Sequence, residues 1–155
     1  MLVLTFQVGD EAMGVDLRRV REVVPRVRLR AVGGAPNWMA GVFVYRGTVV
    51  PTIDLHRLAG GAECPLHLSS RIILVPTHTT DGVERLLGLL ATQVADIRTV
   101  AAGECRTPDL PRDGAIDFGS VVADGPGVLR MLDPDRLLPE NDLRRLLALT
   151  AGVGP

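Results

Sequence analysis

The chain has 155 residues, enough for one domain or for two small halves that share an interface. Its formal net charge is −1, which argues against a general nucleic-acid binder, because such proteins carry excess basic residues to neutralise phosphates. All 17 basic residues are arginine, so the chain has no lysine for a Schiff base or for a P-loop. Apolar residues make up 46% and charged residues 23%, as is typical of a soluble globular domain.

The cysteines and the N-terminal residues indicate the cellular compartment in which the protein is expected. Cys64 and Cys105 form neither a CxxC motif nor a disulfide framework, so a reducing, cytoplasmic compartment is the simplest interpretation. No apolar run reaches the roughly 18 residues of a membrane span. The first residues lack the basic region of a signal peptide and are β-prone. We therefore expect a cytoplasmic protein with no direct membrane insertion.

Most of the chain reads as short β-strands separated by glycine, proline and aspartate. Strands are predicted at residues 2–8, 13–15, 27–32, 41–45, 48–53, 72–75, 86–90, 94–100, 120–122 and 128–132. Between the last two, residues 124–127 are expected to form a turn. Residues 102–114, which include Cys105, have few residues to bury and are interpreted as a mobile loop.

Aspartates that can cap short helices stand at three places. Asp16 is predicted to cap a turn in which Leu17, Val20 and Val24 share one face, until Pro25 ends it. Asp54 is predicted to cap a single turn through residue 58. Both Asp54 and Asp133 are better explained as caps than as catalytic acids, and Asp133 with the following proline is expected to open a short helix.

A C-terminal helix is predicted at residues 140–149. Leu143, Leu146 and Leu147 form one apolar stripe, which is expected to pack on a barrel. Residues 150–155 are expected to fray. Trp38 is interpreted as a core anchor beside a loop, the alternative being a position near a contact surface.

The most informative stretch is residues 38–53. Residues 41–45 and 48–53 are predicted to pair as a hairpin around Arg46 and Gly47, since glycine supplies the positive φ that such turns require. Pro51 indicates an edge or a bulge, because proline cannot donate a hydrogen bond to a neighbouring strand. An arginine on a rigid turn is also a good anchor for a protein partner.

The chain contains a weak internal repeat. Gly14 stands at the same spacing from Val20 and Val23 as Gly88 does from Val94 and Ile97. The pattern of residues 49–58 is echoed by that of residues 128–137. Two similar halves are the natural inference, and so many short strands make each half most simply a small closed β-barrel.

Three segments of the chain together resemble the CheW family of chemosensory adaptors, and the resemblance covers about residues 3–149. They are residues 6–11 (FQVGDE) with 14–16 and 20–25 (VREVVP), residues 35–42 (APNWMAGV) with 45–47 (YRG) and 50–55 (VPTIDL), and residues 128–138 (VLRMLDPDRLL). The middle segment is the most specific of the three. The chain departs from the family at Val44, where asparagine is usual.

The resemblance implies an all-β fold with short helices: two intertwined five-stranded SH3-like barrels and a C-terminal helix. We expect a single domain over residues 1–155, divided roughly into residues 14–70 and residues 1–13 with 71–149. The resemblance also implies a non-enzymatic adaptor that couples chemoreceptors to a CheA-type histidine kinase. In the family, the kinase's regulatory domain pairs with the adaptor barrel to barrel, and the receptor tip lies in an apolar groove between the barrels.

The expected partner-binding residues lie on the predicted hairpin: Gly41, Val42, Val44, Arg46, Gly47, Val49 and Val50. We expect no catalytic residue, no cofactor, no metal and no nucleic-acid partner, and a monomer outside the receptor array. One alternative is a CheW-like interaction module of a non-flagellar pathway, such as surface motility or development. A less favoured alternative is a small metal-binding or enzymatic protein around Cys64 and His67, whose spacing resembles that of metal ligands and near which His56 and His78 also lie.

Overall fold

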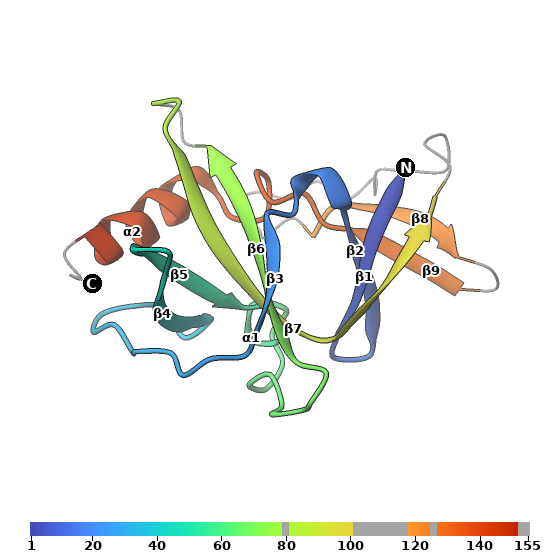
Figure 1. The fold of residues 1–155 in the computed structure, drawn as a ribbon, viewed down its shortest axis with the longest axis horizontal. Coiled ribbons are helices and arrows are strands. Elements are labelled where there is room, and N and C mark those ends of the chain that lie inside the picture. The colour runs from blue at the N-terminus through green and yellow to red at the C-terminus, as the bar shows by residue number, and fades with distance from the viewer. Residues whose placement is uncertain (79–80, 101–117, 125–126, 152–155) are drawn as a thin grey trace.

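The strands form two groups that share one long strand, β7 (Figure 1). The structure is a computed structural model, and it describes residues 1–78, 81–100, 118–124 and 127–151. The strands are β1 (Leu2–Val8), β2 (Glu11–Asp16), β3 (Glu22–Pro25), β4 (Met39–Tyr45), β5 (Thr48–Asp54), β6 (Arg71–His78), β7 (Glu84–Thr99), β8 (Ser120–Asp124) and β9 (Gly127–Met131). The helices are the 3-10 turn η1 (Leu17–Arg19), α1 (Leu55–Leu58) and α2 (Glu140–Ala151).

Each group contains five of the described strands. We call the first group barrel 1. In it the first part of β7 pairs with β6 on one side and with β5 on the other, β6 also pairs with β3, and β5 also pairs with β4. In barrel 2, the second part of β7 pairs with β1, and the order continues through β2 and β9 to β8. This confirms the prediction of an all-β fold with short helices and two five-stranded units.

Strand β7 passes from one barrel to the other without ending, so the prediction of separate strands at 86–90 and 94–100 was wrong. Its pairing with β6 ends at Ala91, and its pairing with β1 begins at Thr92. Gln93, just beyond the change of partner, has φ 50°, a left-handed conformation that lets the strand bend without losing its neighbours.

Three hydrophobic clusters explain why the barrels hold together. One lies within barrel 1 and includes Val50, Ile72 and Leu74, and a second lies within barrel 2 around Val3 and Leu129. The largest cluster lies between the barrels and draws side chains from both. Strand β6 shows the consequence: residues 72–75 are all fully buried, alternately in the barrel 1 cluster and in the cluster between the barrels. A strand buried on both faces reads as a continuous apolar run, as this one does.

Helix α2 covers part of the central cluster. Leu143 and Leu146 are buried in it and Leu147 packs against it, which confirms the predicted stripe. Trp38 is also packed against this cluster and is half-buried, in agreement with its interpretation as an anchor. None of the helices in the described residues is long and apolar enough to span a membrane.

Two predictions near the start of the chain were wrong. The helical turn capped by Asp16 ends at Arg19, and residues 22–25 form a strand instead of continuing the helix. The reason is that the chain pairs with the edge of β6 from Arg21 onward, where Arg21 N–H donates to Leu74 O at 2.7 Å. Residues 27–32 form no strand and make a single bridge, between Arg30 and Val42.

The other differences lie in the second half of the chain. Asp133 caps a turn and not a helix: Asp135 N–H donates to its carboxylate at 3.0 Å, and the chain does not wind further. The middle of the predicted turn at 124–127, residues 125–126, lies outside the described residues, and the residues on either side of it, Asp124 and Gly127, pair with each other. The predicted loop at 102–114 and the last four residues of the chain lie outside the described residues.

The division of the chain into residues 14–70 and residues 1–13 with 71–149 stays a prediction. Strand pairing itself crosses that boundary, because β6 belongs with β3 in barrel 1. The strand pairs place β3 to β6 with the first part of β7 in barrel 1, and the remaining strands with the second part of β7 in barrel 2.

Candidate functional site

The turn between β4 and β5 has the conformation that the sequence predicts. Arg46 and Gly47 both have positive φ, 47° and 79°, and the flanking residues Tyr45 and Thr48 are paired. Two left-handed central residues are the mark of a type I′ hairpin, whose twist matches that of its strands. Arginine is less suited than glycine to positive φ, so this turn carries some strain at Arg46.

Arg46 projects from this turn into solvent. Its side chain is 78% exposed, and its guanidinium lies 5.4 Å from the centroid of the Tyr45 ring and 4.0 Å from the Glu22 carboxylate. The Tyr45 hydroxyl donates a hydrogen bond to the same carboxylate, and this bond raises the pKa of Tyr45. A ring, a carboxylate and a guanidinium thus form a small ordered group beside the turn, with the guanidinium as its exposed member.

The structure places the other predicted partner-binding residues at different depths. Val44 is 51% exposed, Gly47 is exposed and Val49 is half-buried. Val42 is buried between the barrels, and Val50 is buried inside barrel 1. The exposed part of the predicted site is therefore the turn itself with Val44.

Gly41 has a structural role that follows from its geometry. Its φ is 141°, and a Cβ atom at this position would lie 2.6 Å from Arg30 O. The main-chain bridge between Arg30 and Val42 passes directly against it. Glycine is therefore required here both for its backbone conformation and for the close approach of residues 29–30.

Asp54, at the other end of β5, organises the segment that follows. Its carboxylate accepts hydrogen bonds from the N–H groups of His56 and Arg57, at 2.9 and 3.4 Å, which confirms the predicted helix cap. The second carboxylate oxygen accepts from Cys64 N–H at 2.9 Å and so ties down the loop after α1. Asp54 is only 1% exposed, and its hydrogen bonds account for its burial.

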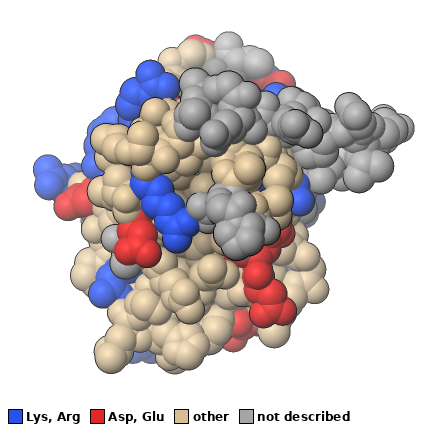
Figure 2. All heavy atoms as spheres, turned by 90° about the vertical axis from the view of Figure 1, so that its right-hand side faces the viewer, with Lys and Arg blue, Asp and Glu red and all other residues tan. Residues whose placement is uncertain are grey.

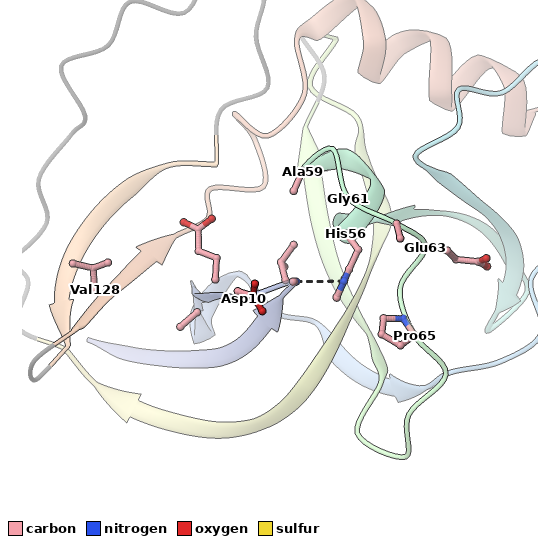
Figure 3. Close-up of a pocket in the computed structure, with 12 residues that line it drawn as sticks. Asp10, His56, Ala59, Gly61, Glu63, Pro65 and Val128 are labelled. Atoms are coloured by element: carbon pink, nitrogen blue, oxygen red, sulfur yellow. Dashed lines mark hydrogen bonds between the residues drawn. The ribbon is translucent and has the colours of Figure 1, made fainter.

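A cavity of about 780 Å³ opens where α1 and its loop face the β1–β2 turn and β9. Its walls therefore come from both barrels (Figure 3). It is lined by Val8, Gly9, Asp10, Glu11, Ala12, His56, Ala59, Gly61, Ala62, Glu63, Pro65 and Val128. The family resemblance implied an apolar groove between the barrels, but sequence reasoning did not find the residues that line this cavity, because they come from parts of the chain that only the packing of the barrels brings together.

His56 joins the two walls of this cavity. The side chain points from α1 toward the β1–β2 turn, and its Nδ1 accepts a hydrogen bond from Gly9 N–H at 3.3 Å (Figure 3). His56 is 8% exposed, and its Nε2 is buried with no hydrogen-bond partner among the described residues. The only signal in the sequence is a histidine two residues after a capping aspartate, which is consistent with a surface imidazole or with a metal ligand and does not predict this hydrogen bond.

Figure 2 shows acidic side chains grouped at the lower right of one face of the molecule. Three carboxylates, of Asp10, Glu11 and Glu63, line the cavity. Glu11 pairs with Arg130 at 2.5 Å, and Glu63 with Arg57 at 3.6 Å. The cavity is thus mostly apolar along its walls, and its polar side chains are three carboxylates and the imidazole of His56.

The residues considered as possible metal ligands differ in their burial and in their neighbours. Cys64 is buried within barrel 1, and burial raises the pKa of its thiol to about 11. His67 is exposed, and His78 lies 3.8 Å from Glu84. In the parts of the chain that the structure describes, no three His, Cys, Asp or Glu side chains are grouped so as to hold a metal. Cys105 lies outside those parts.

Comparison with known proteins gives consistent results. The chemotaxis protein CheW of Treponema pallidum is 27% identical over 151 residues, which cover 95% of this chain and 87% of that protein. The protein FrzA of Myxococcus xanthus is 29% identical over 122 residues, covering 77% of this chain and 73% of FrzA.

A solved structure is similar over most of its length. The crystal structure of the scaffolding protein TtCheW from Thermoanaerobacter tengcongensis aligns with a TM-score of 0.77 over 91% of this chain and 89% of that one, at 23% identity. It shows that the fold is the CheW double barrel. The family described as CheW-like domain matches residues 2–142, nearly the whole chain. The chain therefore belongs to the CheW-like domain family.

Proposed function

We propose that this chain binds two partners at separate surfaces: the regulatory domain of a CheA-type histidine kinase at the β4–β5 turn, and a chemoreceptor tip in the cavity between the barrels. As a member of its family, the chain is a non-enzymatic adaptor that couples chemoreceptors to the kinase in chemotaxis signalling. The family resemblance implied a kinase contact at the hairpin and a receptor groove between the barrels, and the proposal names the residues of this chain that form these two surfaces.

The observation that carries this proposal is that the two surfaces share no residue. The turn is presented by β4 and β5 of barrel 1, whereas the cavity is lined by α1 with its loop, the β1–β2 turn and β9. An adaptor must hold both partners at once, so its sites must not overlap. The exposed guanidinium of Arg46 supports the turn as a kinase contact, since arginine is enriched among residues that dominate binding energy.

The cavity suits a narrower partner. Its volume of about 780 Å³ accommodates several side chains of a helical tip but not a folded domain. Binding there would bring the chain to membrane-anchored receptor arrays through its partners, on their cytoplasmic side. We propose that the chain is a monomer outside such arrays.

The test is calorimetric titration with the regulatory domain of the histidine kinase from the same organism. We expect micromolar affinity with one-to-one stoichiometry. Arg46→Glu should weaken binding at least tenfold, and Arg85→Glu, a charge reversal at the exposed start of β7, should leave binding unchanged. Equal affinity of the wild type and the Arg46 variant would remove the turn from the kinase surface.

A further inference from the structure

The loop between α1 and β6 presents two leucines to solvent. Leu66 is 84% exposed and Leu68 is 96% exposed, more than any other large apolar side chain in the described residues. The loop is nevertheless held in place, because Ser70 Oγ donates to Pro65 O at 2.8 Å and His67 N–H donates to Ser70 Oγ at 3.2 Å. Neighbouring apolar side chains that an ordered loop exposes are typical of a contact site for another molecule.

A second cavity, of about 340 Å³, opens beside this loop. Its apolar walls come from Leu29, Ala40, Leu66 and Leu90, and Val27, which is 40% exposed, also lines it. The exposed loop thus borders a hollow with apolar walls. A partner that covered Leu66 would have room there for an apolar side chain of its own.

The segment that follows β3 supplies positive charge beside this cavity. In it Arg26, Arg28 and Arg30 alternate with apolar residues. The Arg26 guanidinium donates to the main-chain oxygens of Cys64 and Pro65, at 3.1 and 2.9 Å, and so fixes the segment against the loop, along the lower edge of barrel 1 in Figure 1. Arg28 lines the cavity and, like Arg30, is exposed. None of these three arginines has an ion pair with a carboxylate of a described residue.

The carboxylates that line this cavity do not cancel the positive charge. Asp54 is only 1% exposed, and its oxygens already accept hydrogen bonds from three N–H groups. Glu63 pairs with Arg57 at 3.6 Å. The charge that remains available to a partner is therefore that of Arg28 and Arg30, and charge complementarity requires an acidic occupant.

We propose that this face of barrel 1 docks an acidic segment of a protein partner. We call it the basic face, and it comprises Val27, Arg28, Arg30, Leu66 and Leu68. Carboxylates of the segment pair with the two arginines, and an apolar side chain of the segment enters the cavity beside Leu66. The residues of the basic face belong neither to the β4–β5 turn nor to the lining of the larger cavity, so it is a third surface, beyond those proposed for the kinase and the receptor.

The chemistry of the basic face favours a protein segment over other anionic partners. The planar guanidinium of arginine can donate two parallel hydrogen bonds to one carboxylate. A nucleic acid would require enough basic residues to neutralise a series of phosphates, and the chain has a net charge of −1. Recognition of an anionic membrane depends on clusters of about four to eight basic residues, more than this face offers.

The test measures binding of the full chain to a fluorescent synthetic peptide in which glutamate and leucine alternate, by fluorescence anisotropy. This peptide should bind at least tenfold more tightly than a glutamate–serine peptide or a lysine–leucine peptide of the same length, because the basic face recognises both charge and apolar side chains. Its affinity should also fall as salt is added. Equal affinities for the three peptides would overturn the proposal.

Variants of the chain locate the binding. Arg28→Glu should weaken binding of the glutamate–leucine peptide at least tenfold, and Leu66→Ser should weaken it about three- to tenfold. Both side chains are exposed, so thermal unfolding should be unchanged. The matched controls are Arg85→Glu and Val83→Ser, which alter exposed residues near the opposite end of β6 from the loop and should leave the affinity within twofold. Loss of affinity in the controls alone would place the site elsewhere and refute the proposal.

Two further measurements separate the basic face from the surfaces proposed above. Saturating the chain with the kinase regulatory domain, or with a soluble cytoplasmic hairpin fragment of a chemoreceptor from the same organism, should leave peptide binding unchanged. Competition by either would assign the basic face to that partner and overturn its standing as a third surface, while the adaptor function would remain. Sedimentation of the chain with phosphatidylglycerol vesicles, abolished by Leu66→Ser, would assign the face to a membrane and overturn the inference.

Discussion

Removing the carboxylate of Asp54 should destabilise the protein far more than removing that of Asp133, its counterpart in the internal repeat. Asp54→Ala leaves three N–H groups without their acceptor, those of His56, Arg57 and Cys64. Loss of a helix cap costs about 1 kcal/mol. The N–H of Cys64 would in addition be left buried and unpaired, at a cost of about 1–3 kcal/mol. We expect a total loss of about 2–4 kcal/mol.

The matched control is Asp133→Ala. Asp133 accepts a hydrogen bond from Asp135 N–H, and its carboxylate is 43% exposed, so water can replace it. We expect a loss of no more than about 1 kcal/mol for this variant. Urea unfolding followed by Trp38 fluorescence and by circular dichroism measures both values. A loss for Asp54→Ala equal to that of Asp133→Ala would refute the argument that the bond to Cys64 ties down the loop after α1.

Three further predictions concern positions in and around barrel 1. Arg46→Glu should change the free energy of unfolding by less than about 0.5 kcal/mol in urea titrations, because the side chain is 78% exposed; a larger loss would contradict its assignment as a binding residue. Gly41→Ala should cost more than about 2 kcal/mol in the same assay, because its Cβ would lie 2.6 Å from Arg30 O at a φ of 141°; a smaller cost would show that residues 29–30 can move aside. In a Cys105→Ser background, Cys64 should react with a thiol reagent at pH 8 at least a hundredfold faster in urea than when folded, because burial raises its pKa to about 11; equal rates would contradict its burial.

The pKa of Cys64 also predicts a dependence of stability on pH. Because the thiol keeps its proton more strongly in the folded state than in the unfolded state, its contribution to stability is complete below about pH 9.0 and is lost as the pH rises toward about 11. Cys64→Ala should therefore lower the slope of unfolding free energy against pH in this range. An unchanged slope would show that another group is responsible.

Local chemistry made several features predictable from the sequence. The Arg46–Gly47 turn and the Asp54 cap each depend on residues within a few positions of one another, so the sequence alone determined them. The family resemblance and the internal repeat both predicted the double barrel. Both include residues at the ends of strands, where turns and helix caps restrict the choice of residue.

Features that depend on distant neighbours were missed. Residues 22–25 form a strand because they pair with β6. Residues 84–99 form one strand because β6 and then β1 pair with it in turn. The residues that line the cavity were missed because His56 meets Gly9 only when the barrels pack. The spacing of Cys64 and His67 resembles that of metal ligands. The spacing does not show that Cys64 is buried and His67 exposed, which separates the two side chains.

The measurement that tests the account most directly is whether both partners bind at once. The kinase regulatory domain should be titrated by calorimetry into the chain already saturated with the receptor hairpin fragment. Separate surfaces predict one-to-one binding of the kinase domain with an affinity no weaker than in the absence of the receptor fragment. Loss of kinase binding in the presence of the receptor fragment would mean that the two partners compete for one surface, and would contradict the account.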